Sequence, residues 1–114
     1  MTAQDSSAGG RAGPVPVACA LSSAGLAARS LRWDQLAARA MTGRAETGDG
    51  LRLCFRPEPG AGDELRALAA AESECCPWAA WAVREDAAGQ LELDVRSASA
   101  DGITALHGMF TGRR

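Results

Sequence analysis

The sequence predicts an α+β fold, a two-layer sandwich in which helices cover one face of a mainly antiparallel sheet. Three observations predict it. Residues 51–56 and 90–96 alternate apolar and polar side chains, as half-buried strands do. Glycine-containing turns at 48–50 and 86–89 link neighbouring strands and indicate hairpins. Longer stretches with apolar residues at helical spacing lie between them. The expected order is β-α-β-β-α-β-β-α.

The first half of the chain opens with a predicted strand over residues 14–21, which places Cys19 on its apolar face. A helix is expected from Ser22 or Ser23, as N-cap, to about Met41, with Gly43 as its stop. Its apolar stripe consists of Leu26, Trp33, Leu36, Ala37, Ala40 and Met41. Its charged residues, Arg29, Arg32, Asp34 and Arg39, are expected mostly outside the stripe. The hairpin strands follow at 44–47 and 51–56.

The second half begins with a helix over residues 61–75, which ends near Pro77 because a proline disfavours helical geometry in the residue before it. Strands are expected at 78–85 and 90–96. A short final helix is capped by Ser99 or Asp101 and carries Ile103, Leu106 and Phe110 on one side.

Composition predicts a single small domain over residues 14–111 after a disordered tail over 1–13. Of the 114 residues 25 are alanine, whereas Leu, Ile, Val and Phe together number 18, so the core is thin and lined by alanine. The net charge of −2 does not support a fully disordered chain. A domain with so small a core is marginally stable, and a bound metal or a homodimer would offset this.

Several function classes are excluded at this stage. No stretch reaches 18 apolar residues, and the N-terminus lacks the pattern of a secretory signal, so we expect a cytoplasmic protein without a membrane segment. The acidic isoelectric point argues against a nucleic-acid partner. The glycine-rich loops match neither a P-loop nor a dinucleotide fingerprint, so no nucleotide cofactor is expected.

The most unusual local sequence is Glu72-Ser73-Glu74-Cys75-Cys76-Pro77-Trp78. Two adjacent cysteines can present two sulfurs to one soft ion: Hg(II), Cu(I), Zn(II) or As(III). Helical spacing brings Glu72 beside either sulfur. The alternative is that both thiols are core residues, because free cysteine is often a small buried hydrophobe. The negative end of a helix also disfavours a thiolate, unless Cys76 caps a new short helix that begins at Pro77.

The remaining candidates are weaker. Cys19 could complete a set of three sulfurs with Cys75 and Cys76 if its strand lies under the end of the second helix. Cys54 alternates with Arg52 and Arg56 and is expected to face away from the core. His107 is the only histidine and carries no specific prediction. Trp33, Trp78 and Trp81 are expected to fill the core.

These segments resemble a group of small actinobacterial proteins that carry an A-C-x-L strand, here Ala18-Cys19-Ala20-Leu21, and an E-C-C-P-F/W helix end. Such proteins are associated with mercury or arsenic resistance. The resemblance spans about residues 15–110. It implies that Cys19, Cys75 and Cys76 form the shared set, that Glu72 and Glu74 belong to the motif, and that Cys54 is incidental.

Three hypotheses follow. The first is a cytoplasmic protein that binds a soft metal or metalloid, or another small thiophilic ligand, through Cys19, Cys75 and Cys76, for sequestration, delivery or detoxification. The second is an enzyme of the organomercurial-lyase type, in which Glu72 or Glu74 would be the catalytic acid that protonates the departing carbanion. The third is a small interaction domain whose cysteines are structural.

Overall fold

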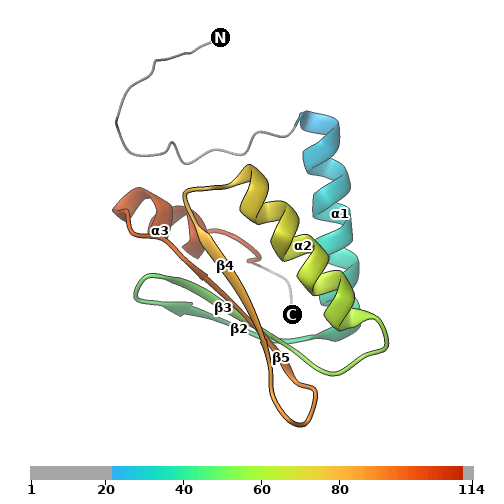
Figure 1. Cartoon of the computed structure of the whole chain (residues 1–114). Coiled ribbons are helices and arrows are strands. Elements are labelled where there is room, and N and C mark those ends of the chain that lie inside the picture. The colour runs from blue at the N-terminus through green and yellow to red at the C-terminus, as the bar shows by residue number, and fades with distance from the viewer. Residues whose placement is uncertain (1–21, 112–114) are drawn as a thin grey trace.

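The computed structural model describes residues 22–111, which form three helices and four strands (Figure 1). The predicted tail over 1–13, the predicted strand over 14–21 and Cys19 lie outside the described residues. The elements are α1 (Ser23–Ala40), β2 (Met41–Thr47), β3 (Gly50–Phe55), α2 (Ala61–Cys75), β4 (Ala80–Glu85), β5 (Leu91–Arg96) and α3 (Ala100–His107).

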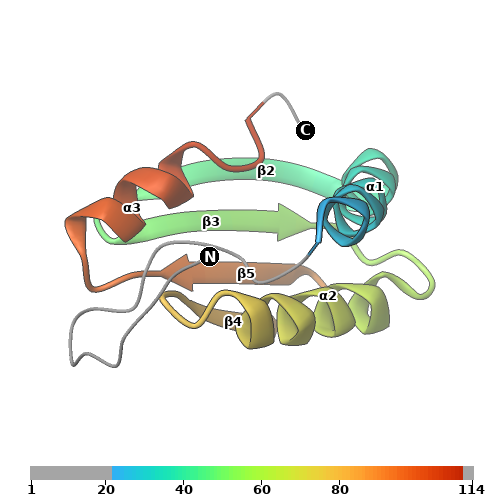
Figure 2. The ribbon, with the colours of Figure 1, turned by 90° about the horizontal axis from the view of Figure 1, so that it is seen from above.

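The four strands form one antiparallel sheet in the order β2-β3-β5-β4. Both predicted hairpins are present as β2–β3 and β4–β5, and the pairing of β3 with β5 joins them. Gly50 is needed in this sheet because a Cβ there would overlap the Val95 carbonyl of β5. Figure 2 shows all three helices over the same face of the sheet. The predicted two-layer α+β architecture is therefore confirmed.

The core lies between the sheet and the helices. On β3 the side chains of Leu51, Leu53 and Phe55 are fully buried, and Leu93 and Val95 oppose them from β5. Most of the remaining core side chains come from the helices, and the rest are Met41 of β2, Leu91 of β5 and Phe110 after α3. Those from the helices are Trp33, Leu36, Ala37, Ala40, Ala61, Leu65, Leu68, Ala69 and Leu106. Burial of these apolar surfaces is the main favourable term in folding.

The junction between α1 and β2 differs from the sequence prediction. The helix ends at Ala40 and Met41 is already extended, with φ −68° and ψ 130°, so the strand begins at once. Gly43 does not stop the helix; it lies inside β2, next to an irregularity in the pairing with β3. Met41 pairs with Phe55, and the Arg56 amide donates to the Ala40 carbonyl at 2.9 Å. Sheet pairing, which local sequence does not encode, therefore sets this boundary.

Most of the other predicted boundaries hold to within two residues. The last helix is an exception: it ends at His107, so Phe110, which was expected on its face, lies in the turn that follows, with φ 59°. The helix over 61–75 is present as α2, and Ser99 is the N-cap of α3. The strand expected from Trp78 begins at Ala80, because the residues after Pro77 form a turn. Within residues 22–111, no helix has both the length and the apolar content needed to cross a bilayer.

The opposite face of the sheet carries charges and Cys54. Arg52 and Arg84 each contact both Glu92 and Asp94, in a network that crosses three strands. Cys54 lies beside Glu92 in the pairing and is half-buried. As predicted, Cys54 faces away from the core.

Candidate metal centre

The end of α2 brings two thiols and one carboxylate together. Glu72 lies three residues before Cys75 and four before Cys76, so one helical face presents all three. Cys76 is the C-cap: its amide donates to the Glu72 carbonyl at 2.7 Å, and its backbone leaves helical geometry with φ −128° and ψ 69°. Ala79 then donates to the Cys76 carbonyl at 3.2 Å, which closes a turn with Pro77 inside it. The alternative in which Cys76 caps a new helix is therefore wrong.

The ligand atoms of these three residues are close to one another. The Sγ atoms of Cys75 and Cys76 are 3.5 Å apart. Oε1 of Glu72 lies 3.6 Å from the Cys75 sulfur and 3.8 Å from the Cys76 sulfur. All three residues are buried. The group therefore has the composition and compactness of a site for one ion.

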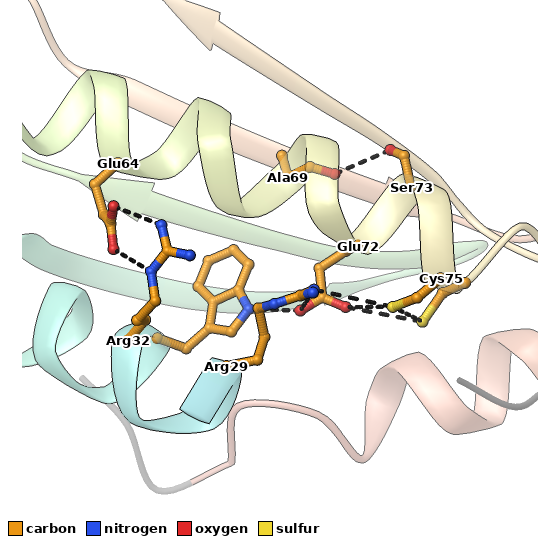
Figure 3. A network of polar contacts seen from close by, with 9 residues as sticks. Arg29, Arg32, Glu64, Ala69, Glu72, Ser73 and Cys75 are labelled. Atoms are coloured by element: carbon orange, nitrogen blue, oxygen red, sulfur yellow. Dashed lines mark hydrogen bonds and ion pairs between the residues drawn. The ribbon is translucent and has the colours of Figure 1, made fainter. Parts of the chain in front are cut away.

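Helix α1 holds the other side of the Glu72 carboxylate (Figure 3). The Trp33 indole N–H donates to Oε2 at 2.8 Å, and Nη1 of Arg29 lies 3.3 Å from the same oxygen. The two oxygens of the carboxylate therefore have different partners: Oε2 contacts Trp33 and Arg29 of α1, whereas Oε1 faces the sulfurs. Its orientation is fixed by groups from another helix.

Arg29 also reaches the sulfurs, with Nη1 3.9 Å from Sγ of Cys75. Its side chain is only 16% exposed. The C-terminus of α2 carries partial negative charge, which by itself disfavours a thiolate at Cys75. The partly buried guanidinium places positive charge beside the sulfurs and opposes the negative charge of the helix end.

Arg29 is the residue that the sequence analysis missed. It was expected among the residues outside the apolar stripe, whereas it lies between α1 and α2 and contacts Glu72 (Figure 3). Trp33 was expected as a core residue; it is one, and it also binds the carboxylate. The available signal was their spacing, because residues four apart lie on the same face of a helix.

The other predicted site residues lie elsewhere. Glu74 is exposed, and the group of mutually close ligand atoms is made by Glu72 with the two cysteines. Cys19 lies outside the described residues. His107 is half-buried and its Nε2 lies 2.9 Å from the Thr47 carbonyl oxygen, which assigns it a contact with β2. Burial raises the pKa of the Cys54 thiol, and neighbouring Glu92 adds to this effect.

A cavity of about 240 Å³ adjoins the thiol pair. Leu26, Trp33, Trp81, Met109 and Phe110 form its apolar walls, and Arg29, Ser30, Glu72 and Cys76 form its polar side. Trp33 lies at the centre of the wall: its ring centroid is 6.3 Å from that of Trp81 and 5.0 Å from that of Phe110, the latter in an edge-to-face arrangement. The cavity therefore joins an aromatic wall to the carboxylate and one sulfur.

Comparison with known proteins gives no match to a family model, a curated protein or a solved structure. The arrangement of its own side chains is therefore the ground for a functional proposal.

Proposed function

We propose that this protein binds a thiophilic metal or metalloid ion through Cys75 and Cys76, with Glu72 as the adjoining carboxylate. One observation carries the proposal: the sulfurs of two buried cysteines lie 3.5 Å apart, and one carboxylate oxygen lies within 3.8 Å of both. Soft ions prefer such sulfur ligands. A reducing compartment keeps thiols free, so we propose that the protein acts in the cytoplasm, in sequestration, delivery or detoxification.

The sulfur spacing favours an ion with bent coordination. For metal–sulfur bonds of about 2.3 Å, the zinc–thiolate length, a separation of 3.5 Å corresponds to an angle at the ion of about 100°. A linear ion such as two-coordinate Hg(II) would hold the sulfurs about 4.6 Å apart at the same bond length. The lone pair of trivalent arsenic compresses its bond angles below the tetrahedral value, so As(III) fits this spacing. A tetrahedral ion such as Zn(II), which would hold the sulfurs about 3.8 Å apart, lies close to it.

As(III) can also react with cysteines at the C-terminal end of a helix, where the partial negative charge disfavours a thiolate. Arsenous acid reacts with a neutral thiol: an arsenic–sulfur bond forms, an arsenic–oxygen bond breaks, and the thiol proton leaves with the hydroxide as water. A preformed thiolate is therefore not required. Oε1 of Glu72 faces both sulfurs, so it can take the proton from a thiol and pass it to the leaving hydroxide.

A third ligand completes the coordination of inorganic As(III). We propose Cys19 for this position, because it belongs to the set that the motif resemblance implies. Cys19→Ser should then weaken arsenite binding while leaving a two-sulfur complex detectable by mass spectrometry. An unchanged affinity for arsenite would remove Cys19 from the set.

The lyase alternative is less well supported. An acid that protonates a carbanion must carry a proton, whereas Oε2 of Glu72 accepts from Trp33 and faces the Arg29 guanidinium. Release of hydrocarbon from an organomercurial by the wild-type protein, lost in Glu72→Gln, would favour the lyase over simple binding.

The proposed binding is tested by native mass spectrometry and calorimetry of the reduced protein with arsenite, Zn(II), Hg(II) and Cu(I). We expect one ion per chain, and loss of binding in Cys75→Ser/Cys76→Ser. Cys54→Ser is the matched control, because it removes a thiol from the other face of the sheet and should leave the stoichiometry unchanged. Equal stoichiometry in the double variant would overturn the proposal and favour structural cysteines.

A further inference from the structure

We propose that the cavity beside Cys76 receives the organic substituent of a monoorganic arsenic(III) compound, with an aromatic ring as the preferred group. This inference rests on the proposed function, because the thiol pair must hold the arsenic. It adds a substrate class: aryl compounds of trivalent arsenic rather than the inorganic ion alone.

The cavity has the size and walls for a ring. Its volume is about 240 Å³, and an apolar cavity of about 150 Å³ is large enough for benzene. Two indole rings, a phenyl ring, a leucine and a methionine form its apolar walls. Offset and edge-to-face contacts with such walls are favourable for another aromatic ring.

The cavity lies next to the atoms that would bind arsenic. Cys76 and Glu72 form part of its lining, so a group attached to an arsenic atom on the thiol pair has space beside it. Trp33 belongs to both parts, because its N–H binds Glu72 while its ring packs against Trp81 and Phe110. Leu26, which also lines the cavity, is 45% exposed, so this part of the wall is open to solvent.

The number of bonds that trivalent arsenic forms also agrees with a monoorganic compound. A monoorganic arsenic(III) hydroxide carries one carbon and two hydroxyl groups. Both thiols replace a hydroxyl: two arsenic–oxygen bonds break, two arsenic–sulfur bonds form, and two water molecules leave, while the arsenic–carbon bond stays intact. Carbon is then the third substituent of a pyramidal arsenic. The two described cysteines are therefore sufficient for this class of compound.

The test compares phenylarsine oxide, methylarsonous acid and arsenite by competition against dithiothreitol, a small dithiol that corrects for the intrinsic reactivity of each compound. Each buried CH₂-sized group changes affinity by roughly fourfold. We expect the phenyl compound to be favoured over the methyl compound by at least about thirtyfold relative to dithiothreitol. Arsenite, measured on the Cys19→Ser variant, is the reference for the thiol pair alone.

Matched variants separate the cavity from the thiols. Leu26→Ala should reduce the preference for phenyl by about tenfold and leave arsenite binding unchanged. Leu31→Ala is its control, because Leu31 is also an exposed leucine of α1 but is absent from the lining. Trp81→Ala should abolish the preference, whereas Trp81→Phe retains a ring and should keep most of it.

The outcomes are distinguishable. If arsenite binds through the thiol pair but the phenyl preference equals that of dithiothreitol, the cavity inference is wrong and the proposed function stands. A preference that Leu26→Ala and Leu31→Ala reduce equally also overturns the cavity inference. If neither arsenite nor the organic compounds bind, both proposals fail.

Discussion

Two arginine–glutamate pairs join α1 to α2, and they differ in what surrounds them (Figure 3). Arg32 and Glu64 form two hydrogen bonds of 3.0 and 2.9 Å, with side chains 45% and 30% exposed. Arg29 and Glu72 have a longer contact of 3.3 Å, but are only 16% and 10% exposed. The better geometry thus belongs to the exposed pair. The less exposed pair differs in its further partners, because Glu72 also contacts an indole and two thiols. The candidate site is therefore recognised by several different polar groups that meet at one carboxylate.

The largest expected effect is on stability. Glu72→Gln removes the buried carboxylate charge that faces the partly buried Arg29 guanidinium, which should lower the free energy of unfolding by about 3 kcal/mol. Glu64→Gln breaks an exposed pair and should cost less than about 1 kcal/mol. Urea denaturation of both variants measures the difference. Equal losses would show that burial does not separate the two pairs.

The next effect concerns the rate of ion capture. If Glu72 moves protons between thiol and hydroxide, Glu72→Gln should slow the reaction with arsenite by at least about tenfold. Stopped-flow measurements under conditions in which the variant is folded report this rate. Glu64→Gln is the control and should react as the wild type does. A wild-type rate in Glu72→Gln would restrict Glu72 to a structural role.

A smaller effect is expected in how the stability contributed by the Arg32–Glu64 pair depends on pH and salt. The hydrogen bonds from Arg32 lower the pKa of Glu64, so the folded state favours the ionised carboxylate. The resulting stabilisation is present above the ordinary glutamate pKa of about 4.3 and is lost as the pH falls through the lowered folded-state value. The stability difference between wild type and Arg32→Gln should therefore shrink below about pH 4, and also in 1 M salt. A difference independent of both would contradict this account.

The smallest expected effect is at Cys54, outside both pairs. Because burial raises its pKa, Cys54 should react with iodoacetamide more slowly at pH 7.5 than the same cysteine in a peptide of residues 51–57. Peptide mapping by mass spectrometry separates its labelling from that of the other cysteines. The rate should still increase up to and beyond pH 9. A rate equal to that of the peptide would show that the folded surroundings do not affect the thiol.

Much of the fold could be predicted because its signals are local. The alternation in 91–96, the helix over 61–75 and the turns between strands each depend on neighbouring residues. The end of α1 could not be predicted, because the pairing of Met41 with Phe55 sets it and this contact joins distant residues. Gly43 was predicted to end the helix, but pairing of β2 with β3 ends it earlier, at Ala40.

The candidate site also has a part that could be predicted from local sequence and a part that could not. Helical spacing alone predicted that Glu72 lies beside the cysteine pair, and the structure brings these three residues together. The distinction between Glu72 and the exposed Glu74 depends on which face of α2 is covered. Arg29 and Trp33 come from another helix, 39 residues or more away from their partners, so no local pattern could place them on Glu72 or Cys75.

The position of both thiols at the end of one helix has a kinetic consequence. A single local event, fraying of the last turn of α2, breaks the hydrogen bond from the Cys76 amide to the Glu72 carbonyl and separates the carboxylate from the sulfurs. An ion held by both sulfurs would oppose this opening. Its residence time would then depend on how often the helix end unwinds, and slow amide exchange at Cys76 would report that the site is occupied.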